Sequence, residues 1–319
     1  MINNLKKHIG KQLRDLKVLR YHLKQLNFSK KNQKKQIIIC FNGVIPHGGL
    51  VDRLKGIISF YDVSKTLDYN FYIQFTNPFL LNTFLEPNKV DWQINTSNVK
   101  YNPFNTRIIN CINNFNFNPL EVIKNSNAST FIVYANIDYL KKNLSNLSED
   151  EVNSRWRNHF NTLFKTTTTL NNALNTIKDE KYNSFHTRFT SIMGDFSDST
   201  TAKISEIERE KLLLNLKKYV NELMSQSVIP FYGFSDSSIF LNYISKTTET
   251  KILEGQPFHM ENYNGGSTLE AHLKTMLDFF TIANSETVYF LKADKMYNSA
   301  FSKYAAIIGD KPFKTISVL

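Results

Sequence analysis

Apolar runs and amphipathic stretches alternate along the chain. In the first half, three buried strands are predicted, at 37–41, 70–76 and 129–137. A helix is predicted over 50–61, where apolar positions recur at helical spacing, while residues 86–128 are rich in Asn and Pro and are expected to be irregular. A long helix is predicted over 148–174, because Ser148 and Glu151 have the spacing of a capping box.

The alternation begins again near residue 180. Strands are predicted at 181–189, 228–238, 250–255 and 287–293. Helices are predicted at 204–227, 268–286 and 298–308. Strands that alternate with helices in this way favour α/β domains with parallel sheets. We therefore expect a leader over 1–35, a first α/β domain over 36–177 and a second over 178–319.

The positive charge is concentrated in the leader. Residues 1–35 contain eleven lysines and arginines against one acid, Asp15, which is a net charge of +10. The other 284 residues contain 28 basic and 27 acidic side chains, which is a net charge of +1. Because the body of the protein is nearly neutral, no nucleic-acid partner is expected.

The leader is predicted to be a basic amphipathic helix. Its apolar residues recur at helical spacing between the basic ones, at Leu5, Ile9, Leu13, Leu16, Leu23 and Leu26. Such a helix can lie on an anionic membrane surface, which would make the protein peripheral on the inner membrane. It can equally pack on the body and leave a charged face in solvent, and the sequence fits both alternatives.

Composition favours a cytoplasmic protein. The basic N-terminus lacks the apolar segment of a secretory signal, and no apolar run of about 18 residues occurs. Cys40 and Cys111 lie in apolar contexts without metal-ligand spacing, so we expect buried thiols in a reducing compartment.

Polar residues follow the predicted strands, and ligands bind at the carboxyl ends of strands in open α/β sheets. In the first domain they are Asn42, His47, Gly48, Gly49, Asp52 and Arg53. In the second domain they are His186, Arg188, Asp195, Ser235, Asp236, Ser237, Glu254, His259, Asn298, Ser299 and Ser302. An arginine, a serine-bearing helix N-terminus and paired glycines together suit an anionic ligand. Dinucleotide, P-loop and zinc motifs are absent from the sequence, so no metal site is predicted.

Four motifs, in order over about residues 36–310, resemble those of the fucosyltransferase superfamily, which includes bacterial α-1,2- and α-1,6-fucosyltransferases. They are Gly48-Gly49-Leu50-Val51-Asp52-Arg53, His186-Thr187-Arg188, Phe234-Ser235-Asp236-Ser237, and Leu277-Asp278-Phe279-Phe280 with Ser299-Ala300-Phe301-Ser302. Val51 stands where the family usually has glycine, and Phe189 stands where many bacterial members have a second basic residue. The chain therefore resembles a divergent member.

The resemblance implies a GT-B-like fold, in which two Rossmann-like domains with parallel sheets face each other across a cleft. It implies an inverting, metal-independent transfer of fucose from GDP-fucose to a hydroxyl of a surface polysaccharide or lipid-linked glycan. Arg188 would hold the diphosphate, and His186 would contact the nucleotide. Ser299 and Ser302 would add phosphate contacts, and Asp278 would support the nucleotide pocket.

The remaining predicted residues complete the donor pocket. Glu254 is a candidate for guanine recognition, because a carboxylate can accept hydrogen bonds from N1–H and the 2-amino group together. Asp236 belongs to the pocket through the third motif. In the first domain, the backbone at Gly48 and Gly49 would approach the ligand, and Arg53 would face the anion or order the cleft.

An inverting transfer needs a base to take the acceptor proton. Asp195 is the first candidate, because core-fucosylating members of the family carry a glutamate at similar spacing after H-x-R. Asp198, His47 and Asp52 are the alternatives. Two other functions stay open: transfer from a different nucleotide sugar, and non-catalytic binding of an anionic ligand or a membrane surface on the same fold.

Overall fold

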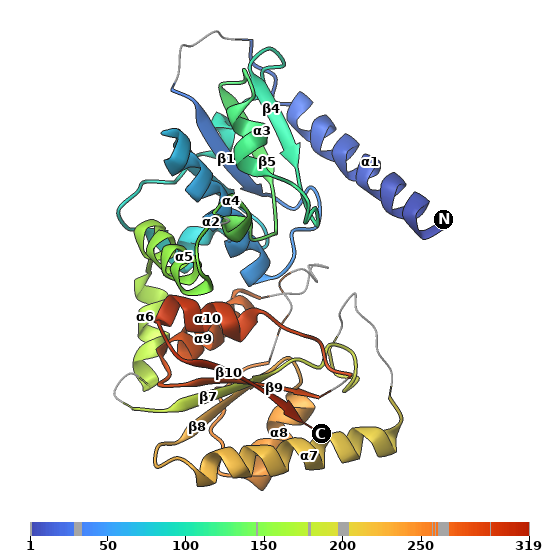
Figure 1. The fold of residues 1–319 in the computed structure, drawn as a ribbon, viewed down its shortest axis with the longest axis vertical. Coiled ribbons are helices and arrows are strands. Elements are labelled where there is room, and N and C mark those ends of the chain that lie inside the picture. Colours follow the sequence, from blue (N-terminus) through green and yellow to red (C-terminus); the bar gives the residue numbers. More distant parts are fainter. Residues whose placement is uncertain are drawn as a thin grey trace. The chain divides into compact units, whose positions relative to one another are not determined.

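The computed structural model describes residues 2–28, 34–144, 146–177, 180–196, 204–256, 258, 260, 268–293 and 295–318. The chain divides into two compact units, Met1–Lys165 and Thr166–Leu319, and each contains a four-stranded parallel sheet (Figure 1). The two predicted α/β domains are thus confirmed. Their division lies before the helix at 168–174 rather than at residue 177, because that helix packs on a helix of the second unit.

In the first unit, the parallel strands lie in the order β2-β1-β5-β4. They are β1 (Gln36–Phe41), β2 (Asn70–Phe75), β4 (Thr106–Asn110) and β5 (Thr130–Tyr134). The side chains of β1 from Ile37 to Phe41 are all buried, as its continuous apolar run predicts for the centre of a parallel sheet. α2 (Leu50–Leu67) follows β1 and confirms the predicted helix.

The region expected to be irregular contains regular elements. The longest of them are β4 and α3 (Pro119–Lys124). The expectation was wrong at these positions because β4 is a short strand that is stabilised by pairing with β5 rather than by a pattern of its own. α3 begins at a proline, and the Asn118 side chain accepts a hydrogen bond from its first turn.

The helix predicted over 148–174 is interrupted. The capping box of Ser148 and Glu151 is confirmed, but α5 (Glu149–Leu163) ends before a run of four threonines. β-branched residues disfavour a helix, and the chain instead forms a short strand and a second helix there. These elements are β6 (Phe164–Thr166), which pairs with β3 (Leu85–Pro87), and α6 (Thr168–Leu174).

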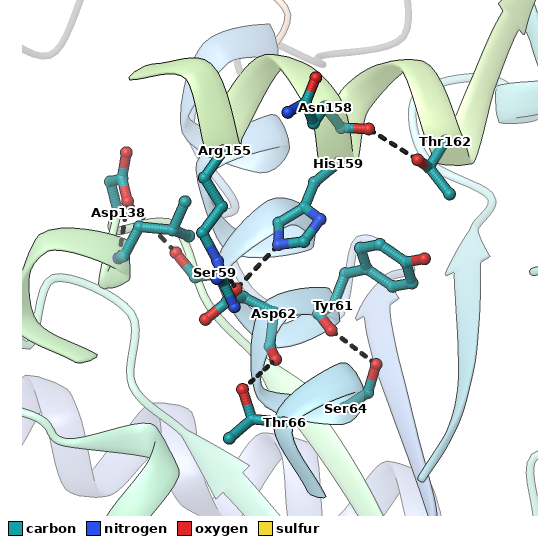
Figure 2. A network of polar contacts seen from close by, with 11 residues as sticks. Ser59, Tyr61, Asp62, Ser64, Thr66, Asp138, Arg155, Asn158, His159 and Thr162 are labelled. Atoms are coloured by element: carbon teal, nitrogen blue, oxygen red, sulfur yellow. Dashed lines mark hydrogen bonds and ion pairs between the residues drawn. The ribbon is translucent and has the colours of Figure 1, made fainter. Parts of the chain in front are cut away.

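A buried carboxylate ties α2 to α5. Asp62 of α2 lies between Arg155 and His159 of α5, as Figure 2 shows, with Oδ1 2.6 Å from Arg155 Nε and 2.8 Å from His159 Nε2. Burial would raise the pKa of Asp62, but the hydrogen bonds from His159 and Arg155 together hold it below its usual value. The ionised carboxylate therefore stabilises the packing of the two helices.

In the second unit, the parallel strands lie in the order β10-β9-β7-β8. They are β7 (Asn183–Thr187), β8 (Phe231–Ser235), β9 (Val288–Ala293) and β10 (Phe313–Val318). The helices are α7 (Glu206–Ser225), α8 (Ser238–Thr247), α9 (Leu269–Asn284) and α10 (Phe301–Gly309). The strand predicted at 250–255 is wrong: only Lys251 pairs with β8, and the chain has turned away by Gly255, whose φ is 103°.

The leader forms a helix, as predicted. α1 (Ile2–Leu23) belongs to the first unit and lies beside its sheet (Figure 1). The remaining short elements are α4 (Leu140–Asn143) and the 3₁₀ helices Leu81–Thr83, Thr96–Asn98 and Asn175–Ile177. Cys40 and Cys111 are buried free thiols, as expected. Within the described ranges, no helix combines the length and apolar character needed to cross a membrane.

Candidate functional site

The end of β7 meets the start of α10 in the second unit. His186 Nδ1 lies 3.1 Å from Ser302 Oγ, although the two residues are 116 positions apart in the sequence. The ring also packs on Phe290 and Phe301, at 5.6 Å between centroids in each case. Burial, with the Arg188 charge as a second cause, lowers the pKa of His186 to about 3, so the ring is neutral at physiological pH. The second and fourth motifs are therefore in direct contact.

Arg188 directly follows β7 and forms an ion pair with Asp236. Its Nε lies 3.2 Å from Asp236 Oδ2, and its guanidinium lies over the Phe196 ring, 4.8 Å from the centroid. Asp236 also accepts the backbone N–H groups of Phe189 and Thr190, at 2.8 and 2.7 Å. Burial raises the pKa of Asp236, an effect that the Arg188 charge opposes. Asp236 thus contacts both the side chain of Arg188 and the backbone that follows it.

The segment before α10 is hydrogen-bonded to the backbone of Arg188. The backbone N–H of Tyr297 donates to the Arg188 carbonyl at 3.2 Å, and the Ser299 hydroxyl accepts the N–H of Phe301 at 3.2 Å. Backbone N–H groups and the helix dipole make this end of the helix favourable for an anion. A backbone hydrogen bond thus joins Arg188 to the segment that leads into α10.

Asp278 forms a buried ion pair that sequence reasoning missed. Lys274, one turn earlier in α9, places Nζ 2.5 and 2.7 Å from the two carboxylate oxygens of Asp278. The loop of Glu254 lies against this pair, since a Cβ on Gly255 would come within 3.1 Å of Lys274 Cδ. Glu254 itself is exposed. The four-residue spacing of a lysine and an aspartate on a largely apolar helix was the available signal for this pair.

The loop between β1 and α2 in the first unit contains Gly43, Gly48 and Gly49. Side chains of neighbouring residues form hydrogen bonds with its backbone. Arg53 is buried, and its Nε donates to the Gly48 carbonyl at 3.0 Å. His47 Nε2 accepts the N–H of Gly43 at 3.1 Å, and burial, followed by the Arg53 charge, lowers the pKa of His47 to about 3. Gly49 is the N-cap residue of α2. Arg53 and His47 are thus both buried and hydrogen-bonded to the backbone of this loop.

The carboxylates predicted as the base, Asp195 first and Asp52 as an alternative, lie in different settings. Asp195 is exposed, but its Oδ2 accepts the Ser237 hydroxyl at 3.0 Å and a backbone N–H of α8 at 2.8 Å. Asp52 lies 3.2 Å from Lys55 Nζ. Two further candidates, Asp198 and His259, lie outside the described residues. In the part of the chain that the structure describes, no group of three or more His, Cys, Asp or Glu side chains could hold a metal ion.

Comparison with known proteins gives a likeness of fold. No family model and no curated protein matches the chain. Among solved structures, it is similar to a variant of the Arabidopsis thaliana fucosyltransferase FUT1 in complex with GDP, with a TM-score of 0.56 and 9% sequence identity. The match covers 92% of this chain and 73% of that chain. This chain has a GT-B-like fold.

The GT-B-like fold agrees with the motif positions. In this fold, both sheets are parallel and carry their ligand-facing loops at the carboxyl ends of the strands, which is where the first and second motifs lie. Phe196 and Lys274 are the residues that only the structure adds, because their contacts with Arg188 and Asp278 depend on how a loop and a helix pack.

Proposed function

We propose that this chain is a glycosyltransferase of the fucosyltransferase superfamily, of the bacterial type, that transfers fucose from GDP-fucose. The observation that carries the proposal is the contact of His186 with the first turn of α10, next to Arg188 at the carboxyl end of β7. An arginine and a helix N-terminus together suit the diphosphate of a nucleotide sugar. The likeness of fold to a fucosyltransferase that was solved with GDP supports the same donor.

In the proposed reaction, a base removes the proton of an acceptor hydroxyl, the oxygen attacks the anomeric carbon with inversion, and GDP leaves. Arg188, oriented by Asp236, would neutralise the leaving diphosphate, and for this reason we expect no metal requirement. Asp195 is the proposed base, and the oxygen that would take the proton is Oδ1, since Oδ2 is bound at the start of α8. Glu254, in its exposed loop, is the proposed guanine contact.

The acceptor is proposed to be a surface polysaccharide or a lipid-linked glycan, modified in the cytoplasm. The resemblance of the motifs to bacterial fucosyltransferases supports this class of acceptor. The loop at Gly48 and Gly49 is the proposed acceptor-side surface of the first unit, because it lies at the carboxyl end of β1.

Nucleotide binding tests the proposal. Ligand at 100 times its dissociation constant stabilises the folded state by about 2.7 kcal/mol, which raises the melting temperature by roughly 5 to 10 °C in a domain of this size. We expect GDP and GDP-fucose to give this shift in the full chain, and Arg188→Ala to abolish it. Arg107→Ala, which removes an exposed arginine of the first unit, is the matched control and should keep the shift.

Arg188→Ala leaves the buried Asp236 without its cation and can destabilise the domain. Arg188→Lys is therefore the second variant, because it keeps the charge but loses the two-pronged geometry that holds a diphosphate. It should bind GDP at least about tenfold more weakly. A shift with UDP instead of GDP would point to another nucleotide sugar, and GDP-fucose bound without any turnover would point to a binding protein. No response to any nucleotide would refute the proposal.

A further inference from the structure

The apolar stripe of α1 faces away from the domain on which the helix packs. Leu13 and Leu16 are 55% and 54% exposed, and Ile9 and Leu23 are exposed to a similar degree. In an α-helix, residues three and four positions apart lie on one side, so these four side chains form a continuous face. We call Ile9, Leu13, Leu16 and Leu23 the leucine face.

The opposite side of α1 holds the helix on the first unit. Val18 is fully buried, and it packs with apolar residues of β1 and β5. His22 is also buried, with Nε2 2.9 Å from the hydroxyl of Tyr134. Val18 is two positions from Leu16, and a step of two residues turns about 200° around a helix. The contact with the domain therefore leaves the leucine face in solvent.

The charges around the leucine face are all positive. Lys17 and Arg20 of α1, and Lys24 directly after it, are exposed. The leader as a whole has eleven basic residues and one acid, and that acid, Asp15, accepts a hydrogen bond from Asn110 at 2.6 Å on the side of the domain. The surface that surrounds the apolar stripe is thus complementary to an anionic surface.

Two exposed aromatic rings lie close together beyond the end of α1. Phe28 is 62% exposed and Phe104 is 84% exposed, and their ring centroids lie 6.3 Å apart. The segment of Phe104 lies beside the end of the leader, because Asn27 and Tyr101 join through a backbone hydrogen bond of 2.9 Å. Exposed aromatic rings beside leucines and lysines are typical of segments that insert into the headgroup region of a bilayer.

We propose that the leucine face of α1 binds the surface of an anionic lipid bilayer. The leucines would enter the boundary between headgroups and acyl chains, and the lysines and Arg20 would contact lipid phosphates. A second copy of the chain fits this face less well, because pairing two leucine faces would place basic side chains against basic side chains. The proposal goes beyond the proposed transferase activity and does not depend on it.

Vesicle binding by the full chain tests the proposal. We expect co-sedimentation with vesicles that contain phosphatidylglycerol to be at least about tenfold stronger than with phosphatidylcholine alone, and to weaken with added salt. The variant Leu13→Glu/Leu16→Glu should lose at least about tenfold in affinity for the anionic vesicles. The matched control is Ile207→Glu/Leu214→Glu, which changes two exposed apolar residues of α7 and the same net charge. It should bind within about twofold of the unchanged protein.

The exposed positions of both variants should leave the melting temperature unchanged, so a loss of binding reports on the surface and not on folding. Equal losses in the two double variants would overturn the proposal, since they would reduce the effect to net charge. Equal binding to neutral and anionic vesicles would overturn it as well. Dimers in analytical ultracentrifugation that only Leu13→Glu/Leu16→Glu dissociates, without vesicle binding by the unchanged protein, would assign the face to a second copy.

Discussion

Replacing Asp62 by asparagine should destabilise the first unit by removing the charge between α2 and α5. The carboxylate is buried, and its Oδ1 lies 2.6 Å from Arg155 Nε and 2.8 Å from His159 Nε2. Asparagine keeps the size of the side chain and one acceptor oxygen. It loses the charge, so the remaining amide oxygen can accept hydrogen bonds from Arg155 and His159 only as a neutral group.

The expected loss of stability can be worked out from the contacts of Asp62 with Arg155 and His159. A hydrogen bond to a charged group contributes about 1.5 to 3 kcal/mol, but Arg155 is 37% exposed and recovers part of this from water. We therefore expect Asp62→Asn to reduce the free energy of unfolding by about 2 to 3 kcal/mol. In a unit of this size, that loss lowers the melting temperature by roughly 4 to 12 °C.

Circular dichroism melts at two pH values provide the assay. The control is Asp68→Asn, at the end of the same helix, where the carboxylate pairs with Lys34 at 2.9 Å in solvent. This change should leave the melting temperature nearly unchanged. Because the folded-state pKa of Asp62 is lowered, its stabilisation is present above the ordinary aspartate pKa of about 3.9 and is lost as the pH falls through the folded-state value.

The difference between Asp62→Asn and the unchanged protein should therefore be large at pH 7 and should shrink in acid, below about pH 4. If Asp62→Asn had a melting temperature at pH 7 no lower than that of Asp68→Asn, the stabilising role of the buried ion pair would be refuted. A difference that stays the same in acid would show that packing, and not charge, accounts for the loss.

Three further substitutions test local contacts of the candidate residues by their effect on the melting temperature. Gly48→Ala and Gly194→Ala both place alanine at a φ near 80°, but only at Gly48 does the new Cβ clash, 2.7 Å from Asp52 Oδ2. Gly194→Ala should cost about 1 kcal/mol and Gly48→Ala clearly more, whereas equal losses would contradict the close approach of Asp52 to Gly48. Ser302→Ala removes the hydroxyl 3.1 Å from His186 Nδ1 and should destabilise the second unit by about 1 kcal/mol, and no change would argue against that hydrogen bond.

Strong local patterns predicted most of the fold. The continuous apolar run of β1 and the capping box of α5 both appear where the sequence places them. β4 was missed because a short strand is stabilised by its neighbour, and the strand at 250–255 was wrong because one residue pairs where six were expected. The local pattern indicates which secondary structure a segment favours by itself. Whether a short or weakly patterned segment becomes a strand depends on pairing with segments far away in the sequence.

At the candidate site, too, the sequence indicated the residues but not their contacts. Its arginine, histidine and serines were visible as polar residues at strand and helix ends. The sequence did not show that Asp236 binds Arg188 and two backbone N–H groups, or that Arg53 is buried against the Gly48 carbonyl. The same type of side chain can bind a ligand or stabilise the fold. Only its neighbours in the tertiary structure show which of these roles it is placed for.

The leader shows most clearly what the sequence determines and what the tertiary structure decides. Sequence alone determined a basic helix with leucines at helical spacing, because periodicity is a property of one segment. It did not determine which side of that helix packs on the domain. The tertiary structure decided that Val18 and His22 are buried and that the leucines stay exposed, because a place for those two side chains exists only where β1 and β5 lie together.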